Sequence, residues 1–375
     1  MAITVPMTAI LWIIDPFRIF HNPWIRDNYY YNKPIIQASG IINTDDFKSI
    51  ILGSSMAANF SPGEATRIFR NKFVNLTLDG TSLAERSVVL RYALARKNLS
   101  DVIISLDWET LDTLSISGSP IENYSYLYDE NRLNDLLVYA SNPDTLRFIF
   151  CKNLIYRGDH LCRKKIRSLE SLVEWQSNLD RNNRFGGIEN WSGGKNHNKF
   201  IEYLKGIAND IDHSESGNRP HVNMANLSAA TSRHKFVFER NILTYAKKYP
   251  NTNFYLFFPP YSRLRFALLA QSQPQIFNEY LEDIRFIVKL SSTHQNIKVF
   301  GFENESFPDN IANYMDTVHY HQRFNSMMLE WMASGSHQLK PSNTELYIEQ
   351  ITARANNYSF KSISEKINSY LNKSH

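Results

Sequence analysis

A serine in a glycine-containing turn is the residue of this sequence that best fits the role of a catalytic nucleophile. Ser55 closes the triplet Gly53-Ser54-Ser55, which follows a short apolar run and precedes Ser61-Pro62, a typical helix start. A buried strand that turns into a helix places its turn residues at the carboxyl edge of a sheet, where open α/β folds hold their active sites. Ser55 is therefore a candidate nucleophile, provided that a base can take its proton.

A histidine with a carboxylate three residues before it could supply that base. Asp316 and His319 lie near the far end of the chain, in the order Asp-Thr-Val-His. Histidine exchanges a proton near neutral pH, so His319 can act as the general base. Asp316 can accept from the other imidazole nitrogen, which fixes the tautomer and stabilises the imidazolium. With Ser55, these residues predict a Ser-His-Asp triad.

Acyl transfer by such a triad also needs N–H donors for the negative tetrahedral intermediate. The backbone N–H groups of Ser55 and Gly80 follow two expected strands and are the best candidates. A glycine at position 80 would let the backbone approach a ligand closely. The third donor stays open among Asn59, Thr81 and Ser82.

The elements that must position these residues follow an alternating pattern of apolar and amphipathic segments. The expected strands are 48–53, 73–78, 101–106, 253–258 and 297–301. The expected helices are 62–71, 83–97, 234–249, 275–290 and 323–333. Ser82 with Glu85 three residues later predicts a capping box at the start of the second helix. Strands that alternate with helices in this way predict an α/β fold with a mainly parallel, five-stranded sheet.

Three further segments complete the predicted organisation, in which residues 45–335 form one α/β domain. Residues 1–44 are a lead-in, and residues 336–375 are a polar helical tail. Pro16, Pro23 and Pro34 predict irregular structure over residues 15–47. Residues 111–235 are an insertion, in which the Asn-, Gly- and Ser-rich stretch 182–226 reads as a loop that serves as a cap or lid. Residues 1–14 carry no charge but are short for a membrane span. We expect them to form one of three things: the remnant of a membrane anchor, an interfacial segment or a buried first element.

The composition limits the classes of function. Lysines and arginines exceed acidic residues by 41 − 37 = 4, and no long basic run occurs, which argues against nucleic-acid binding. Cys151 and Cys162 are the only cysteines; they form either one disulfide or two ordinary thiols. His319 and His321 could share a face, but no third ligand has suitable spacing, so we expect no metal site and no cofactor.

Taken together, the motifs resemble the GDSL/SGNH hydrolase superfamily over residues 45–110 and 250–335. More narrowly, they resemble its bacterial, membrane-anchored branch, which is associated with the modification of cell-surface polysaccharides. The shared segments are Asp15-Pro16-Phe17, Gly53-Ser54-Ser55, the stretch from Asn75 to Gly80, and Asp316 to Tyr320. An α/β-hydrolase is the nearest alternative, but there several strands precede the nucleophile and the acid and the histidine lie on separate loops.

The resemblance implies a flavodoxin-like, three-layer α/β/α sandwich with Ser55 as nucleophile, His319 as base and Asp316 as its partner. It also implies a carbohydrate or polysaccharide substrate. The protein would then work in the bacterial cell envelope, on the periplasmic or extracytoplasmic face, with membrane association through its N-terminus.

One expected motif of the superfamily is missing. Its third block, Gly-x-Asn-Asp, supplies an asparagine to the oxyanion, whereas this chain reads Ser105-Leu106-Asp107-Trp108. The Asp107 carboxylate would repel an oxyanion unless it is protonated or turned away. Two functions follow. One is O-acetyltransferase or O-acetylesterase chemistry through an acyl-Ser55 intermediate, and the other is polysaccharide binding or assembly without turnover. Trp108 and Tyr261 are the expected substrate-binding residues in either case.

Overall fold

The computed structural model describes residues 4–25, 30–31, 33–129, 165–166, 169, 183–192, 197–216 and 220–373. The chain divides into two compact units, one of residues 1–103 and 113–174 and the other of residues 104–112 and 175–375. We call them the first and the second unit and describe each by itself. Cys151, Cys162 and most of the predicted insertion before residue 183 lie outside the described residues.

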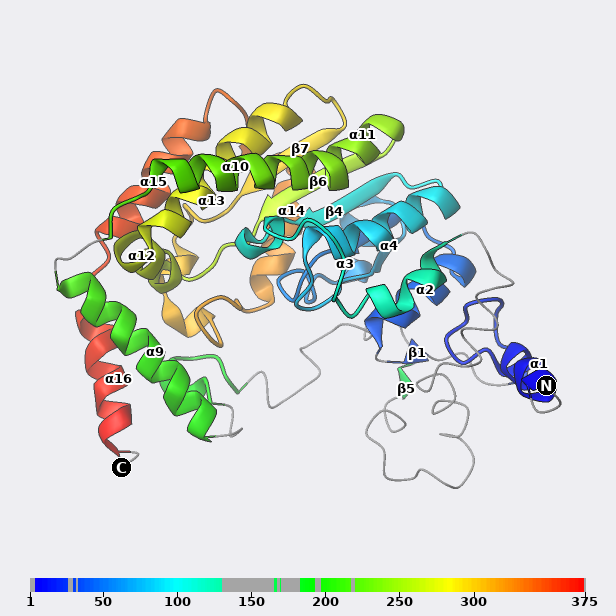
Figure 1. The fold of residues 1–375 in the computed structure, drawn as a ribbon, viewed down its shortest axis with the longest axis horizontal. Helices are drawn as coiled ribbons and strands as arrows, with labels where there is room; N and C mark the ends of the chain where they lie inside the picture. The colour runs from blue at the N-terminus through cyan, green and yellow to red at the C-terminus, as the bar shows by residue number, and fades with distance from the viewer. Residues whose placement is uncertain are drawn as a thin grey trace. The chain divides into compact units, whose positions relative to one another are not determined.

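The first unit contains the elements from the N-terminus to most of strand β4, and in addition η2 and β5 (Figure 1). Its helices are α1 (Thr4–Ile14), α2 (Pro34–Thr44), α3 (Pro62–Phe69), α4 (Leu83–Arg96) and the 3₁₀ helix η2 (Glu122–Tyr128). Its strands are β1 (Tyr30–Tyr31), β2 (Ser49–Leu52), β3 (Phe73–Asn75), β4 (Asp101–Ser105, whose last two residues fall in the second unit) and β5 (Lys165–Ile166).

The second unit contains the remaining elements. Its helices are α9 (His197–Glu215), α10 (Met224–Phe238), α11 (Thr244–Lys248), α12 (Arg263–Ser272), α13 (Pro274–Ser291), α14 (Arg323–Ser334), α15 (Thr344–Asn356) and α16 (Lys361–Lys373). Its strands are β6 (Asn253–Phe258), β7 (Ile297–Gly301) and β8 (Gln338–Leu339). Its short helices are η1 (Trp108–Leu111), η3 (Ile188–Asn190), the π-helical η4 (Glu239–Leu243), η5 (Phe307–Asp309) and η6 (Ile311–Asn313).

The main sheet has six strands in the order β3-β2-β4-β6-β7-β8, one more than predicted, and β1 and β5 form a separate two-stranded sheet in the described structure. Strand β2 pairs in parallel with β3, and β6 pairs in parallel with β7. The additional strand, β8, pairs antiparallel with β7 through Val299↔Leu339 and Phe300↔Gln338. The protein is therefore an α/β protein with a mostly parallel sheet, and this arrangement is consistent with three layers.

Side-chain caps fix where the helices of the first unit begin. The Ser61 hydroxyl accepts from the Glu64 N–H at the start of α3. At α4 the Ser82 hydroxyl accepts from the Glu85 N–H while the Glu85 carboxylate accepts from the Ser82 N–H, so the predicted capping box is confirmed. Each cap follows a strand, and the two connections contain the predicted site residues Ser55 and Gly80.

The lead-in before β2 is more regular than the sequence predicted. Helix α2 occupies residues expected to be irregular, because Pro34 suits a first helical turn. The Asp15 carboxylate organises the preceding turn by accepting from the backbone N–H groups of Ile19, Phe20 and His21. Gly40 lets α2 pack on this turn, since a β-carbon there would lie 1.8 Å from the Phe17 carbonyl oxygen.

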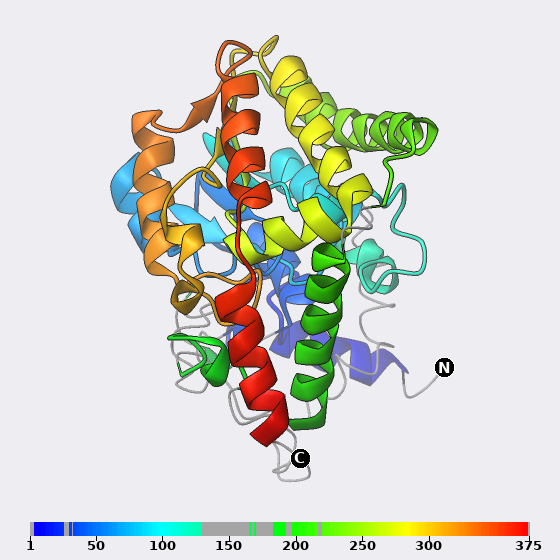
Figure 2. The same ribbon diagram turned by 90° about the vertical axis from the view of Figure 1, so that its left-hand side faces the viewer.

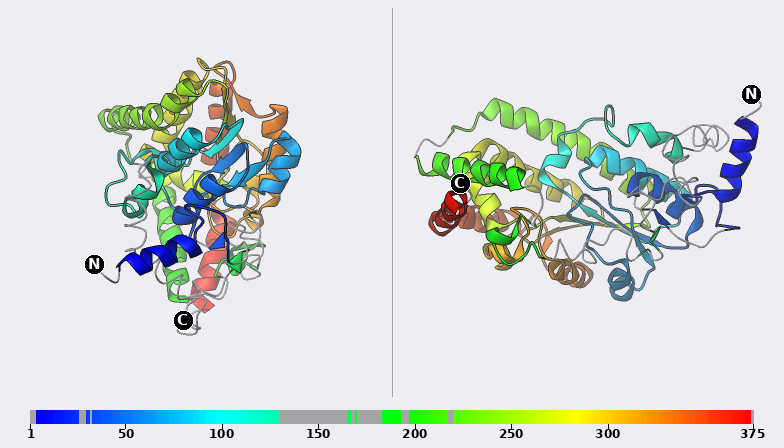
Figure 3. Two further views of the ribbon diagram at one scale, coloured as in Figure 1. Left: turned by 90° about the vertical axis from the view of Figure 1, so that its right-hand side faces the viewer. Right: turned by 90° about the horizontal axis from the view of Figure 1, so that it is seen from below.

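Helix α1 lies at the edge of the first unit (Figure 3). Its sequence is apolar and uncharged, and Ile10, Trp12 and Ile13 are exposed. Among the described residues, no helix combines the length and the apolar composition that a membrane crossing requires.

The segment expected to be a loop at 182–226 is partly helical, which corrects that prediction. Helix α9 lies beside α16 in the second unit (Figure 2), and Phe200, Leu204 and Ile207 are buried in a cluster with Ile363 and Ile367. The polar residues of 197–215 lie between these apolar positions at helical spacing, so their number suggested a loop although the period is helical.

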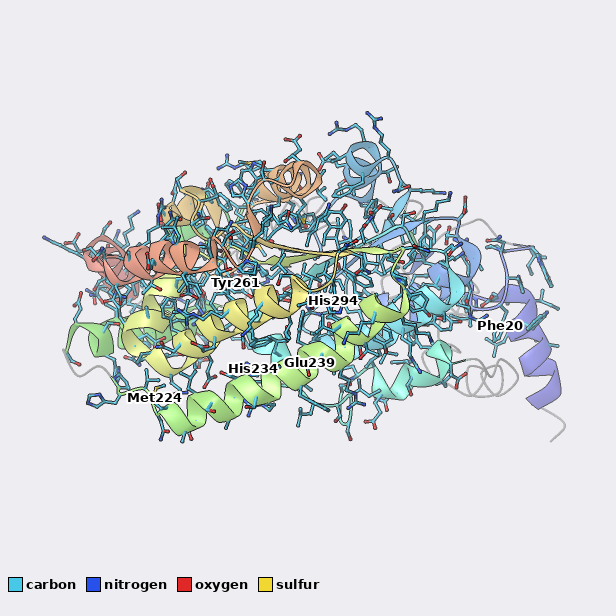
Figure 4. The ribbon with its side chains drawn as sticks, turned by 90° about the horizontal axis from the view of Figure 1, so that it is seen from above. Phe20, Met224, His234, Glu239, Tyr261 and His294 are labelled. Atoms are coloured by element: carbon cyan, nitrogen blue, oxygen red, sulfur yellow. The ribbon has the colours of Figure 1, made fainter. Side chains whose placement is uncertain are left out.

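Helix α10 continues through the π-helical turn η4 into α11, and Figure 4 labels Met224, His234 and Glu239 along it. The helix begins ten residues before the predicted start at 234, where Asn223 caps it by accepting from the Ala225 and Asn226 N–H groups. Its buried face carries Leu227, Ala230 and Val237. The following strands, β6 and β7, have the bounds that the sequence predicted.

Candidate functional site

The turn that carries Ser55 leaves the end of strand β2. The Gly53 carbonyl still accepts from the Leu78 N–H, so the sheet pairing reaches the glycine. The chain then turns tightly, since the Ala57 N–H donates to the Ser54 carbonyl and the Ala58 N–H donates to the Ser55 carbonyl. Ser54 is 7 % exposed, whereas the Ser55 residue is intermediate in exposure. This difference favours Ser55 over Ser54 as the reactive hydroxyl.

A buried amide fixes the path of the chain after Ser55. The Asn75 side-chain amide donates to the Ala57 carbonyl at 3.1 Å and to the Phe60 carbonyl at 3.0 Å. The side-chain carbonyl oxygen of Asn75 accepts from the Thr77 N–H at 3.0 Å. One side chain thus makes three hydrogen bonds to the backbone. The sequence placed Asn75 in a shared motif without a role, and the structure shows that it holds the Ser55 turn.

The predicted oxyanion donors of the first unit lie in two turns. Gly80 is exposed and has φ +65°, and a β-carbon at this position would meet nothing within 4 Å, so its conformation rather than crowding favours glycine. Asn59 is intermediate in exposure. The side chains of Thr81 and Ser82 have other partners: Thr81 donates to the Leu78 carbonyl and Ser82 caps α4. These hydroxyls are therefore poorer candidates for the third donor.

Asp316 and His319 come together in the second unit as the sequence predicted. The His319 Nδ1 lies 2.7 Å from the Asp316 Oδ2, and the His319 N–H donates to Oδ1 at 2.8 Å. Burial favours the neutral carboxyl, but the charge of His319 and the hydrogen bonds from its ring and backbone and from the Val318 N–H outweigh it and lower the pKa of Asp316. The ionised carboxylate thus holds Nδ1 in the protonated tautomer, leaving Nε2 as the basic nitrogen.

The loop that carries this pair is fastened at Thr317, between Asp316 and His319. The Ser262 hydroxyl donates to the Thr317 carbonyl at 2.6 Å. The Tyr203 hydroxyl accepts from the Thr317 N–H at 3.1 Å and donates to its side-chain oxygen at 3.0 Å. Burial, reinforced by the negative charge of Asp316, raises the pKa of Tyr203 to about 12, so this hydroxyl stays protonated.

Residues 183–192, within the predicted insertion, hold the other side of the same loop. The Arg184 guanidinium donates to the Trp191 and Met315 carbonyls and lies 3.8 Å from the Asp316 Oδ2. The Trp191 indole N–H donates to the Tyr314 carbonyl at 2.9 Å. Trp191 is 2 % exposed, so it is a buried anchor and not a surface for stacking sugars.

Asp107 stands where the resemblance led us to expect a different motif. Its carboxylate is buried, accepts from the Ser105 hydroxyl at 3.0 Å and lies 3.5 Å from the Tyr261 hydroxyl. Tyr261 (Figure 4) is 3 % exposed and packs against Phe266, so its ring presents little surface. Trp108 is more accessible, and the Arg265 guanidinium carbon lies 4.6 Å from its ring centre.

The predicted site residues thus fall into two groups. Ser55, Gly80 and Asn59 belong to the first unit, and Asp316, His319, Trp108 and Tyr261 belong to the second. The pairing of His319 with Ser55 therefore stays a prediction. Among the residues that the structure describes, no three His, Cys, Asp or Glu side chains are arranged to hold a metal ion.

The residues that sequence reasoning missed, Arg184, Tyr203 and Ser262, all act on the loop from 314 to 320. They contact it across 55 to 131 residues of sequence, and no local pattern announces such contacts. Comparison with known proteins assigns no role to these residues, because no family model and no curated protein matches the chain.

Proposed function

We propose that this protein carries out serine-dependent acyl-ester chemistry on a cell-surface polysaccharide, with the flavodoxin-like SGNH arrangement of a three-layer sandwich. The observation that carries the proposal is the Asp316–His319 pair, in which a 2.7 Å contact between carboxylate and Nδ1 leaves Nε2 as the base. A serine nucleophile completes this chemistry, and Ser55 is the residue whose turn, exposure and motif fit best.

In the proposed reaction, the Ser55 hydroxyl oxygen attacks the carbonyl carbon of an acyl ester while His319 Nε2 takes its proton. The tetrahedral intermediate places its negative charge on the former carbonyl oxygen, where the Ser55 and Gly80 N–H groups would donate. Collapse breaks the ester C–O bond, and the imidazolium protonates the departing alcohol. The product of this half-reaction is acyl-Ser55.

The second half-reaction decides between two enzymes. If water attacks acyl-Ser55, with His319 again taking the proton, a free acid leaves and the protein is an O-acetylesterase. If a sugar hydroxyl attacks, the acyl group moves to that sugar and the protein is an O-acetyltransferase. Both use the same triad, and exclusion of water from the site separates them. The likeness to polysaccharide-assembly proteins favours transfer, in the bacterial envelope and with membrane association through the N-terminal segment.

A fluorophosphonate probe tests the nucleophile directly, because it reacts with an activated serine and adds a mass that can be located by peptide mapping. We expect wild type to be labelled at Ser55, and Ser55→Ala and His319→Ala to lose the label. Ser54→Ala is the matched control, since it removes the neighbouring hydroxyl and should retain labelling. Thermal melts of each variant show that the fold is kept. A folded wild-type protein that resists the probe would count against the triad.

A second candidate function rests on Asp107. A buried carboxylate at the place of the expected oxyanion asparagine disfavours a developing negative charge nearby. One of its oxygens accepts from the Ser105 hydroxyl, which holds this carboxylate in place. On this observation the chain would bind or help to assemble a polysaccharide without turnover. A protein that binds glycan but takes no label would favour this alternative.

A further inference from the structure

Arg265, in the first turn of α12, is a cation for which the described structure supplies no acceptor. Its guanidinium carbon lies 4.6 Å from the centre of the Trp108 ring. Its Nε is buried and makes no hydrogen bond to any residue that the structure describes. Within the same residues no carboxylate pairs with it, although a buried donor without a partner is costly.

Arg263, two residues earlier in the same turn, shows what a compensated arginine looks like here. It is 2 % exposed, its Nε donates to Asp309 at 2.7 Å, and one terminal nitrogen donates to the Glu303 and Glu305 carbonyls. Its Nη1 is buried without a partner among the described residues, but the fold still provides a carboxylate and two carbonyl oxygens for this arginine. Arg265 has an aromatic ring in place of these acceptors.

The position of Arg265 ties it to the loop that carries Asp316 and His319. The Ser262 hydroxyl, which caps α12, accepts from the backbone N–H of Arg265 at 3.2 Å and donates to the Thr317 carbonyl at 2.6 Å. Tyr203, which holds Thr317, lies within the influence of both charges: Asp316 raises the pKa of its hydroxyl and Arg265 lowers it, while burial dominates. All of these residues belong to the second unit.

The chemistry of a guanidinium on an indole is specific. The planar fork of arginine matches a carboxylate through two parallel N–H···O bonds, and a partly desolvated setting strengthens such bonds. The indole face holds the guanidinium in place by a cation–π contact and offers an apolar edge beside it. A ligand that combines a carboxylate with a ring of C–H groups would satisfy both side chains.

We propose that Arg265, held on Trp108, is a cationic subsite that binds the carboxylate of an acidic sugar next to His319. This proposal rests on the proposed function, which makes a polysaccharide the substrate. It narrows that substrate to a polysaccharide that contains uronic acid residues. The charge of Arg265 would then select the acidic sugar and place it beside the base.

Binding measured without turnover tests this subsite. The Ser55→Ala protein is titrated with tetragalacturonate and, as the neutral partner, with maltotetraose by calorimetry at low salt. We expect the acidic tetramer to bind about tenfold more tightly, as a bidentate charged pair can provide. In the same background, Arg265→Gln should remove this preference, and Arg265→Lys should keep only part of it because lysine lacks the planar fork.

Arg240→Gln is the matched control, because Arg240 is an exposed arginine of the same unit in the π-helical turn η4. It should leave the acidic preference unchanged. Trp108→Ala should weaken binding of the acidic tetramer, because the guanidinium loses its support. Melting curves confirm that each variant is folded before it is titrated.

Three results would overturn the subsite. The first is equal affinity for acidic and neutral tetramers. The second is an acidic preference that survives Arg265→Gln. The third is tighter binding of glucose 6-phosphate than of glucuronate, which would make phosphate the recognised group. The fluorophosphonate experiment is independent: an Arg265-dependent acidic preference in a protein that takes no label keeps the subsite and rejects the ester chemistry.

Discussion

Asn75 is a buried polar residue whose side chain hydrogen-bonds to a different segment of the chain. Its amide donates to the Ala57 and Phe60 carbonyls, which lie in the turn after Ser55. We predict that Asn75→Ala lowers the free energy of unfolding by about 1–3 kcal/mol, because two buried carbonyls lose their donor. It should also slow fluorophosphonate labelling, since the turn is no longer fixed. Urea unfolding and labelling rates measure the two effects.

Asn75→Asp is the matched variant for this prediction. It keeps the oxygen that accepts from the Thr77 N–H and removes only the two donated bonds. Its loss should therefore be at least as large as that of Asn75→Ala, because the new carboxylate would face two carbonyls. Unchanged stability in both variants would show that the amide does not hold the turn.

Asp316 is the residue on which the proposed chemistry depends most after Ser55. We predict that Asp316→Asn slows acyl transfer roughly 10⁴-fold, because the amide stabilises neither the protonated Nδ1 tautomer nor the imidazolium. Turnover of an aryl acetate measures the loss. A rate within a few-fold of wild type would remove Asp316 from the triad, provided that melting curves show a folded variant.

The same substitution changes stability at acid pH. The folded-state pKa of Asp316 lies below its ordinary value, so its stabilising contribution is present above about pH 3.8 and is lost as the pH falls through the lowered pKa. Asp316→Asn should lack this part of the acid dependence.

Single residues differ in how far the sequence could reveal them. Asp316 and His319 were predictable because a carboxylate three residues before a histidine can reach its ring within one loop, and the structure confirms their contact. Tyr203 and Arg184 were not predictable, since each contacts the loop across more than 110 residues. The uncompensated Arg265 could be recognised only by counting its partners in space.

At the scale of elements, a buried histidine joins three segments of the second unit. His234 of α10 is 2 % exposed; its Nδ1 lies 2.9 Å from Asp283 of α13 and its Nε2 lies 2.9 Å from Asp112, just after η1. Arg233 also pairs with Asp112, and Glu279 acts on Asp283 through its charge. Because both ring nitrogens face carboxylates, the imidazolium is the form that fits.

We call His234 with its two carboxylate partners, Asp283 and Asp112, the His234 clamp. The clamp predicts a loss of stability at alkaline pH. Burial would lower the pKa of His234, but its hydrogen bonds to Asp283 and Asp112 and their charges outweigh burial and raise it above 6.5. A raised folded-state pKa means that the stabilisation is full below about pH 6.5 and is lost as the pH rises through the raised value. Chemical unfolding at a series of pH values measures this loss.

His234→Ala should cost about 3–5 kcal/mol at pH 6, because Asp283 would stay buried without its partner. The variant should also lose the alkaline decline, and this second effect distinguishes the clamp from a simple cavity. Arg233→Ala is the control: it removes an exposed pair with Asp112 and should cost no more than about 1 kcal/mol. A His234 variant with the wild-type pH profile would contradict the clamp.

The elements themselves were predictable where apolar residues follow a period. Strands β6 and β7 match their predicted bounds, since β6 carries the apolar run from Phe254 to Phe258 and only Lys298 interrupts the apolar residues of β7. Helix α12 was missed because its buried residues, which include Arg263 and Gln271, lie on all sides, so no amphipathic period marks it. Strand β8 was missed because two residues are too few for any pattern. Strand β3 ends early at Asn75, whose side chain turns back to the Thr77 N–H.

At the scale of the whole molecule, one buried acid should contribute strongly to the pH dependence of unfolding. Glu303 is fully buried after β7, with its carboxyl accepting from the Tyr280 and Tyr347 hydroxyls. Burial raises its pKa from 4.5 to about 7, because these hydrogen bonds only partly offset the loss of water. The folded chain thus holds a proton that the unfolded chain releases.

The sign of the effect follows from that proton. Between about pH 4.5 and about pH 7 the folded state binds more protons at Glu303, so stability falls as the pH rises, by about 3 kcal/mol in all. Above about pH 7 both states are ionised and this decline stops. We predict that Glu303→Gln, which keeps the shape and hydrogen-bonding capacity, removes the decline.

Urea unfolding of wild type and Glu303→Gln between about pH 5 and about pH 8 tests this directly. The difference between the two proteins should shift by about 3 kcal/mol in favour of the glutamine variant as the pH rises. Glu305→Gln is the matched control, because Glu305 lies two residues after Glu303 on the same loop. Glu305 is half-buried and pairs with His337. Parallel pH profiles for wild type and Glu303→Gln would show that the buried carboxyl ionises in the fold at little cost, and would leave the His234 clamp as the source of the pH dependence.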